Sequence, residues 1–436
     1  MRGFPSTNAG FARERPALHR LRVGLTVAGV VLTFAVSSML LATVGYHYET
    51  SGGLPFEKFH PGTLMVFAAF ALLVVEDGPD ATVGRLLRDD RLSLIYVACL
   101  AFYMLYVPLV LGRPVTFIVD TLMAPAVVAV LLARTDPRSL RIMDRIIHGL
   151  MAANAVIGSL ESLLKWRLVP YYIGDEIITF DWRSTALLGH PLQNAGVTAV
   201  YALLLLTGLR GGLPARWALP AFVLQLAALP AFGGRTAAAG LAAAALVWLG
   251  VRALLILSGR RFALSSLLWV ALLCPLVAAG IWFASGSDYV ALFVDRFVDD
   301  SGSAETRVRM LSLFGDFSWG DLFIGPDPET LAALQIREGL ELGLESFVVA
   351  FLLTSGIFAS SVLFLGLGLF VIALGRLVPW QGKAALGLYL ILNVTSTGFS
   401  SKGVAFSLVV MLLLVLTWAS PRGEAEGQRR RASAMA

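Results

Sequence analysis

The sequence predicts an all-α polytopic membrane protein of about twelve transmembrane helices, with one large loop outside the membrane between the ninth and tenth helices. Hydrophobic residues make up 57% of the 436 residues, charged residues only 14%, and the mean hydropathy is +0.77. Apolar runs of about 17–25 residues, the length a helix needs to cross a bilayer, recur along most of the chain. Soluble multidomain folds are therefore excluded.

Charged flanks and Pro or Gly breaks delimit these runs. We expect helices at residues 22–45, 61–75, 92–112, 115–133, 142–163, 185–209, 216–232, 236–257, 264–285, 346–374, 384–399 and 402–418. The first run is too long for a signal peptide and has no small-residue cleavage site, so it should remain as an anchor.

The distribution of basic residues predicts the orientation of the chain. With the amino terminus in the cytoplasm, 23 of the 34 Lys and Arg residues lie on the cytoplasmic side, which is the positive-inside pattern. The chain then divides into a cytoplasmic segment (1–21), helices one to nine (22–285), an outer loop (286–345), helices ten to twelve (346–418) and a cytoplasmic tail (419–436).

The outer loop is the soluble segment large enough to fold over a site. It carries 12 acidic residues against 4 arginines. Two stretches, Tyr289 to Phe297 and Arg307 to Phe317, have apolar residues at helical spacing, so we expect surface helices that lie on the membrane or cap the bundle.

Three outer arginines depart from the charge bias and are candidate anion ligands: Arg183, Arg235 and Arg307. Arg235 follows two glycines and opens a helix, where close backbone approach and the helix amino terminus favour an anion. Arginine binds phosphate bidentately and stays charged, so a cluster of three suits a pyrophosphate. The alternative for each is a side chain that reaches lipid headgroups.

Within the outer loop, Arg307 is preferred over Arg309. Residues two apart on a helix point about 200° from each other, so both cannot face one ligand. If Met310, Leu311, Phe314 and Phe317 form the buried face, Arg307 shares it, whereas Arg309 lies with Glu305 and Asp316.

Each of the other candidate polar residues has two possible interpretations. His190 and Asn194 follow Arg183 in Gly189-His190-Pro191-Leu192-Gln193-Asn194 and are either ligand contacts or helix-start residues. Glu345 is either a general base near the arginines or a solvated acid at a helix start. Four residues inside helices suggest a proton relay or helix-packing hydrogen bonds: Asp120, His148, Asn154 and Glu161.

Other classes of site find no support in the pattern. Cys99 and Cys274 lie in separate apolar runs, which argues against a disulfide or a metal site. Motifs of nucleotide-driven pumps, serine hydrolases and zinc enzymes are absent from the sequence. The basic residues flank hydrophobic segments, so membrane lipids, and no nucleic acid, are the expected partners.

Three segments resemble the superfamily of O-antigen ligases and O-antigen or exopolysaccharide polymerases, bacterial inner-membrane glycosyltransferases of the GT-C type. Arg183 to Asn194 is similar to that family's Arg, Gly and His/Asn-Pro segment, and Gly234-Arg235-Thr236-Ala237 resembles its Ser-Arg-Gly-Ala turn. Arg307 to Leu311, followed by Leu322 to Gly325, resembles its loop pattern. The topology, with one large periplasmic loop after the ninth helix, is also similar.

The chain departs from the family's pattern in three places. Leu311 replaces a Trp, Pro326 follows Gly325 where a second Gly is common, and Glu345-Ser346 replaces a His-Asn pair, followed by the helix breaker Gly356. Ligases of this group are thought to use that His near the acceptor. Its absence favours a polymerase over a ligase.

The resemblance implies a metal-independent enzyme without cofactors that joins undecaprenyl diphosphate-linked oligosaccharides at the periplasmic face of the inner membrane. Arg235 and Arg307, helped by Arg183, would bind the donor pyrophosphate, with Glu345 as base. His190, Asn194 and Arg309 would contact substrate, and a flippase and a chain-length regulator are candidate partners. The alternatives are ligase-type transfer of glycan to another acceptor and a secondary transporter or glycan exporter.

Overall fold

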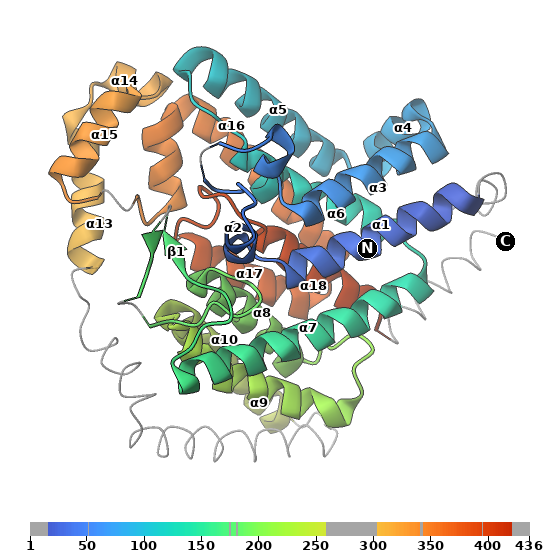
Figure 1. Ribbon diagram of the computed structural model, residues 1–436. Helices are drawn as coiled ribbons and strands as arrows, with labels where there is room; N and C mark the ends of the chain where they lie inside the picture. Colours follow the sequence, from blue (N-terminus) through green and yellow to red (C-terminus); the bar gives the residue numbers. More distant parts are fainter. Residues whose placement is uncertain are drawn as a thin grey trace.

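The computed structural model describes residues 16–50, 52–173, 176–179, 182–258, 303–340, 343–394 and 396–420. In these ranges the regular structure is helical apart from one β-hairpin with two residues in each strand (Figure 1). Six described helices are long and apolar enough to cross a membrane, or seven if the bent pair α3 and α4 is one span. The chain is therefore a helical membrane protein.

The described elements follow one another along the chain in the order given below. The helices up to the hairpin are α1 (Pro16–Ala35), α2 (Ser38–Thr43), η2 (Pro55–Lys58), α3 (Pro61–Asp77), α4 (Pro79–Asp89), α5 (Arg91–Leu111), the π-helix η3 (Val119–Met123), α6 (Ala124–Ala133) and α7 (Pro137–Leu164). The hairpin pairs β1 (Tyr172–Ile173) with β2 (Glu176–Ile177). The helices after it are α8 (Pro191–Thr207), α9 (Ala215–Phe232), α10 (Arg235–Leu257), α13 (Ser303–Ser312), η4 (Leu313–Asp316), α14 (Trp319–Ile324), α15 (Pro328–Arg337), α16 (Phe347–Leu377), α17 (Trp380–Val394) and α18 (Ala405–Trp418).

Helices are present at most of the expected runs, but several boundaries differ. The run 384–399 is replaced by Trp380–Val394, and α4 was not expected. The run 22–45 breaks after Ala35, because the Ser37 side chain accepts a hydrogen bond from Leu40 N and starts α2 as a separate helix. The run 185–209 becomes helical only at Pro191. The expected helix 264–285, the stretch Tyr289 to Phe297 and most of both terminal segments lie outside the described residues.

The helices divide into those that face lipid and those that fill the core. Leu109 of α5 is 81% exposed and Leu257 of α10 is 83% exposed, which suits a hydrocarbon environment and not water. By contrast, α8 and α18 are buried along almost their whole length. An apolar helix buried on all sides belongs to the centre of a large bundle.

Polar contacts gather at the two ends of the bundle. At one end, Arg22 of α1 pairs with Glu76 of α3 at 2.8 Å, and Arg134 pairs with Asp77 at 2.6 Å. The start of α7 reaches the same end, where Asp144 accepts from Gly212 N. We call this the terminal end, because α1 begins there. Figure 1 shows α4 at this end, on the right.

The opposite end carries the β-hairpin and helices α13 to α15, on the left of Figure 1, and is called the hairpin end. Hydrogen bonds join its loops across large sequence separations. Tyr106 donates to the carbonyl of Ile324, Phe347 N donates to the carbonyl of Ser396, and Lys402 Nζ donates to the carbonyl of Tyr48. Segments distant in sequence are therefore fixed against one another at this end.

Helices α13 to α15 form a small cap with its own apolar core. Met310, Leu313, Leu322 and Leu331 are buried together, and Leu353 of α16 joins them. The cap is thus packed on α16, chiefly through α14 and also through α15. This confirms that Arg307 to Phe317 is helical, up to Asp316.

Gly356 bends α16 at the point where the cap rests. Its φ of 76° lies in the left-handed region inside an otherwise helical segment, which favours glycine. A Cβ there would lie 2.4 Å from the carbonyl carbon of Ile324. Across the bend, Ser360 Oγ donates a hydrogen bond to the carbonyl of Phe351 at 2.8 Å. The kink and the docking of the cap therefore depend on one residue.

We expect Gly356→Ala to destabilise the protein by roughly 1–3 kcal/mol, because the side chain meets both a strained φ and the backbone of α14. Thermal unfolding of the purified chain in detergent measures the effect. Gly368→Ala is the matched control, since Gly368 lies in the same helix with no atom within 4 Å of an added Cβ. Equal unfolding temperatures for the two variants would contradict the proposed constraint.

Candidate functional site

The structure brings the segments that carry Arg183 and Arg235 together at the hairpin end. Ser184 N donates to the carbonyl of Ala231 at 2.8 Å, so the residue after Arg183 is bonded to the last turn of α9. A Cβ on Gly234 would lie 2.2 Å from Cβ of Ala195, so α10 begins in direct contact with α8. Both arginines are half-buried.

Two buried polar residues of α7 hold the segment that follows Arg183. Glu161 is 1% exposed, and one of its oxygens accepts from Ser184 Oγ, Thr185 N and Ala186 N at 2.5 to 3.1 Å. Ala186 is a non-glycine residue with a φ of 40°. The carboxylate thus satisfies the N–H groups of an irregular, strained turn inside the bundle.

Asn154 lies two helical turns before Glu161 and also accepts hydrogen bonds from N–H groups of this turn. Its Oδ1 accepts from Leu187 N at 3.1 Å and from Leu188 N at 3.3 Å, and its Nδ2 donates to Asn194 Oδ1 at 2.7 Å. Asn194 in turn donates to the carbonyl of Thr185. Asn194 is fully buried and engaged at both ends of its amide, so the structure gives it a positioning role.

His190 is the N-cap of α8. Its Nδ1 accepts from Leu192 N at 3.3 Å, and its ring meets the Tyr171 ring edge to face at 5.7 Å. The ring therefore closes the turn that begins at Arg183, which fits the helix-start interpretation. Arg167 supports the other side of this turn, because its Nε donates to the carbonyl of Arg183 while its guanidinium lies over the Trp182 ring.

The cap places Arg307 differently from the expectation. Arg307 is exposed, and the buried side of α13 and η4 is formed by Met310 and Leu313. The expectation was wrong because Leu311, taken as a core residue, is 57% exposed. Arg309 pairs with Glu305 at 2.6 Å, as predicted from their shared face.

Glu345 is exposed and lies two residues before the first residue of α16. It directly follows Leu344, which lines a cavity described below. Asp316, predicted to share the exposed side with Arg309, pairs instead with Arg337 of α15.

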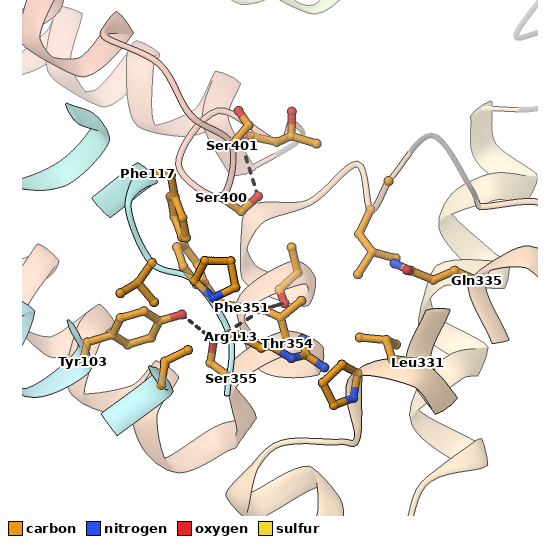
Figure 2. A pocket seen from close by; sticks show the side chains of 18 residues that line it. Tyr103, Arg113, Phe117, Leu331, Gln335, Phe351, Thr354, Ser355, Ser400 and Ser401 are labelled. Carbon is orange, nitrogen blue, oxygen red and sulfur yellow. Dashed lines mark hydrogen bonds between the residues drawn. The ribbon is translucent and has the colours of Figure 1, made fainter. Parts of the chain in front are cut away.

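A cavity of about 590 Å³ lies at the hairpin end, between the α5–η3 loop, α15, the start of α16 and the 397–401 loop. This volume falls within the range of about 300–1,000 Å³ typical of small-molecule sites. Figure 2 shows its labelled side chains around Arg113. Seven further lining residues carry hydroxyl or amide groups: Tyr103, Gln335, Thr354, Ser355, Thr397, Ser400 and Ser401.

Arg113 is the charged residue among those that line this cavity. One Nη donates to the carbonyl of Pro326 at 3.1 Å, while its buried Nε has no hydrogen-bond partner in the described chain. Burial lowers the pKa of the guanidinium, and the nearby Tyr103 and Asp327 raise it. The side chain is anchored at one edge, and its other Nη has no hydrogen-bond partner among the described residues.

Arg113 was missed by the sequence reasoning, and none of the seven predicted site residues lines this cavity. It stands in Gly112-Arg113-Pro114 between two apolar runs and is one of the outer cations. The same departure from the charge bias that selected Arg183 would have selected it. What the sequence lacks is any sign that the loop meets residues 326 and 355, more than 200 positions away.

The polar residues inside the helices have local partners. Asp120 accepts from His60 N at 3.2 Å, whereas His148 lies near the terminal end and contacts Tyr201 and the carbonyl of Arg210. These are hydrogen bonds between packed segments and not one connected relay. Among the described residues, no three His, Cys, Asp or Glu side chains are grouped to hold a metal ion.

No protein-family model matches the chain, and no curated protein matches its sequence. The resemblance in three short segments therefore stays a prediction, and chemical assignments depend on the residues themselves.

We expect Glu161→Gln to loosen the turn after Arg183, because an amide N–H₂ would replace an oxygen that accepts from three donors. Loss of charge-assisted bonds of about 1.5–3 kcal/mol should speed hydrogen exchange of the Thr185 and Ala186 amides by about 10–150-fold. Mass-spectrometric exchange on the 182–190 peptide measures this. The exposed Glu329→Gln is the control, and unchanged exchange in Glu161→Gln would refute the assigned role.

Proposed function

We propose that the protein is a polysaccharide polymerase that joins lipid diphosphate-linked oligosaccharide units at the outer face of the membrane. The observation that carries the proposal is the meeting of the Arg183 and Arg235 segments at the hairpin end. Two guanidinium groups held on one side of a membrane suit a lipid-borne diphosphate, which has its charge at the interface and its chain in the bilayer.

In the proposed reaction, a sugar hydroxyl of one lipid-linked unit attacks the anomeric carbon of a second unit. The new C–O bond forms as the bond from that carbon to the diphosphate oxygen breaks, and the lipid diphosphate leaves. Arg235 and Arg183 stabilise the negative charge that grows on the leaving group. The proton of the attacking hydroxyl passes to Glu345, which is exposed at the start of α16.

Arg307 has a different role in this proposal from the one its sequence position indicated. It is exposed on α13, so we assign it to a first contact with the diphosphate head group at the membrane surface and not to a buried contact. Arg309, paired with Glu305, contributes to folding of the cap. The rigid turn from Thr185 to His190 then fixes the geometry of the site, and His190 and Asn194 act through it.

The proposed orientation places the terminal end in the cytoplasm and the hairpin end in the periplasm of a bacterial inner membrane. Arginines at the terminal end, including Arg22, Arg85 and Arg134, support this orientation, because cytoplasmic loops carry an excess of basic residues. The full count of twelve spans includes the run 264–285 and the short helices α8, α17 and α18.

We expect Arg235→Ala to abolish chain extension and to cause lipid-linked repeat units to accumulate. Loss of one preorganised donor to the leaving group should slow turnover by about 10²–10³-fold. Thin-layer or gel analysis of lipid-linked glycan from cells that express each variant gives the readout. Arg252→Ala, at the opposite end of the same helix, should leave polymer length unchanged. Polymer of normal length from Arg235→Ala would refute the proposal.

We expect Glu345→Gln to slow elongation by about 10²–10⁴-fold while donor binding is retained, since the amide cannot accept the proton. Single-turnover elongation with saturating lipid-linked donor separates chemistry from binding. Glu338→Gln, which removes another acidic residue at the end of α15, is the control. Unchanged turnover in Glu345→Gln would refute its role as the base and would favour its interpretation as a solvated acid at a helix start.

A further inference from the structure

We propose that the cavity around Arg113 binds a sugar ring that carries a carboxylate, an acidic sugar of the glycan. This inference rests on the proposed function for the sugar and on the cavity itself for the charge. The cavity is separate from the Arg183 and Arg235 segments in its lining, and it comes from four parts of the chain: the α5–η3 loop, α15, α16 and the 397–401 loop.

The lining has the chemistry of a carbohydrate site. The side chains of Gln335, Thr397 and Ser401 have no hydrogen-bond partner among the described residues, so their donors and acceptors remain available to sugar hydroxyls. Phe117 and Phe351 supply aromatic surface beside them, with ring centroids 6.1 Å apart. A ring with polar edges and apolar faces fits such a mixture.

Arg113 adds one positive charge to this neutral lining. Its orientation is fixed by the hydrogen bond to the carbonyl of Pro326, and Pro114 and Pro328 also line the cavity. The other Nη has no hydrogen-bond partner among the described residues and is the donor that a ligand in the cavity can reach. A carboxylate oxygen would satisfy that donor with a charge-assisted hydrogen bond.

The local charge balance favours a single carboxylate over a diphosphate. No carboxylate in the described chain lies within ion-pair distance of Arg113. Asp327 is nevertheless near enough to reduce slightly the attraction of the guanidinium for an anion. The Asp327 carboxylate is held at the start of α15 by Thr330 N and Thr330 Oγ1, both at 2.9 Å. One cation moderated by one acid suits one negative charge, and a diphosphate needs more positive charge.

The cavity is held in shape by parts that are themselves constrained. Tyr103 and Ser355 share a hydrogen bond across the α5–α16 interface, next to the Gly356 kink. Thr121 of η3 donates to the carbonyl of Ser401 and accepts from Gly403 N, which fixes the 397–401 loop. The polar groups are therefore preorganised, which favours affinity for a small ligand.

The test is binding of digalacturonate to the purified full chain in detergent, measured by calorimetry against its methyl ester. The ester has the same rings without the charges. Wild type should bind the acid at least about tenfold more tightly than the ester, and salt should reduce the difference. Arg113→Gln should abolish the preference. Arg337→Gln, an exposed cation on α15 paired with Asp316, should keep it.

Asp327→Asn gives a reciprocal test that does not depend on loss of a cation. Asparagine remains a good N-cap, and removal of the neighbouring negative charge should strengthen acid binding by about two- to fivefold. Equal affinity of wild type for acid and ester, or a preference that survives in Arg113→Gln, would overturn the proposal. Inorganic pyrophosphate that displaces digalacturonate and binds more tightly through Arg113 would also overturn it.

These measurements need no turnover, so they separate this inference from the proposed polymerase. Loss of elongation in Arg235→Ala with no acid preference in the cavity would support the enzyme and refute the acidic-sugar site. Acid binding through Arg113 in a chain that elongates no glycan would refute the polymerase and retain the site.

Discussion

The architecture depends on one constraint: wherever a helix breaks inside the bundle, the freed backbone groups must find partners within the protein, since lipid offers none. The turn before α8 meets this requirement through Glu161 and Asn154, whose side chains accept from four consecutive backbone N–H groups between Thr185 and Leu188. The kink in α16 meets it through Ser360. Both breaks lie toward the hairpin end, which also carries the residues of the proposed sites.

This arrangement gives the hairpin end two sites with different supports. The Arg183 and Arg235 segments are fixed by α7, α8 and the last turn of α9, through backbone bonds and small-residue contact. The Arg113 cavity is fixed by α5, α16 and the cap, through Tyr106, Tyr103 and the Gly356 bend. The two sets of supporting contacts named here share no residue, as the proposal of separate diphosphate and sugar sites requires.

Much of the helical order could be predicted from the sequence, because apolar runs of bilayer length are a strong local signal. The interruptions were harder. Ser37 and Pro191 are ordinary cap and first-turn residues, and apolar neighbours on both sides hid the breaks they make. Gly356 was recognised as a helix breaker, but its contact with Ile324 joins positions 32 residues apart through the fold of the cap.

The candidate site was harder still to predict, because its residues converge through tertiary contacts. Arg183 and Arg235 were selected by their departure from the charge bias, and their segments do meet. Arg307 was placed on the wrong face because a helical wheel treats Leu311 as core, whereas a lone exposed leucine is common on a protein surface. Arg113 carried the same charge signal, and only the packing of the cap on α16 gives it a cavity.

The different surroundings of the arginines explain how one face could treat two kinds of anion separately. A leaving diphosphate gains charge during the reaction, so it is best served by guanidinium groups whose positive charge is added together, as the neighbouring Arg183 and Arg235 segments allow. A sugar carboxylate keeps its charge throughout, so it requires only one fixed donor. In the proposed cavity, the exposed Asp327 adds a small opposing charge to that of Arg113. We propose that this acid contributes to selectivity for a single negative charge, at the expense of affinity.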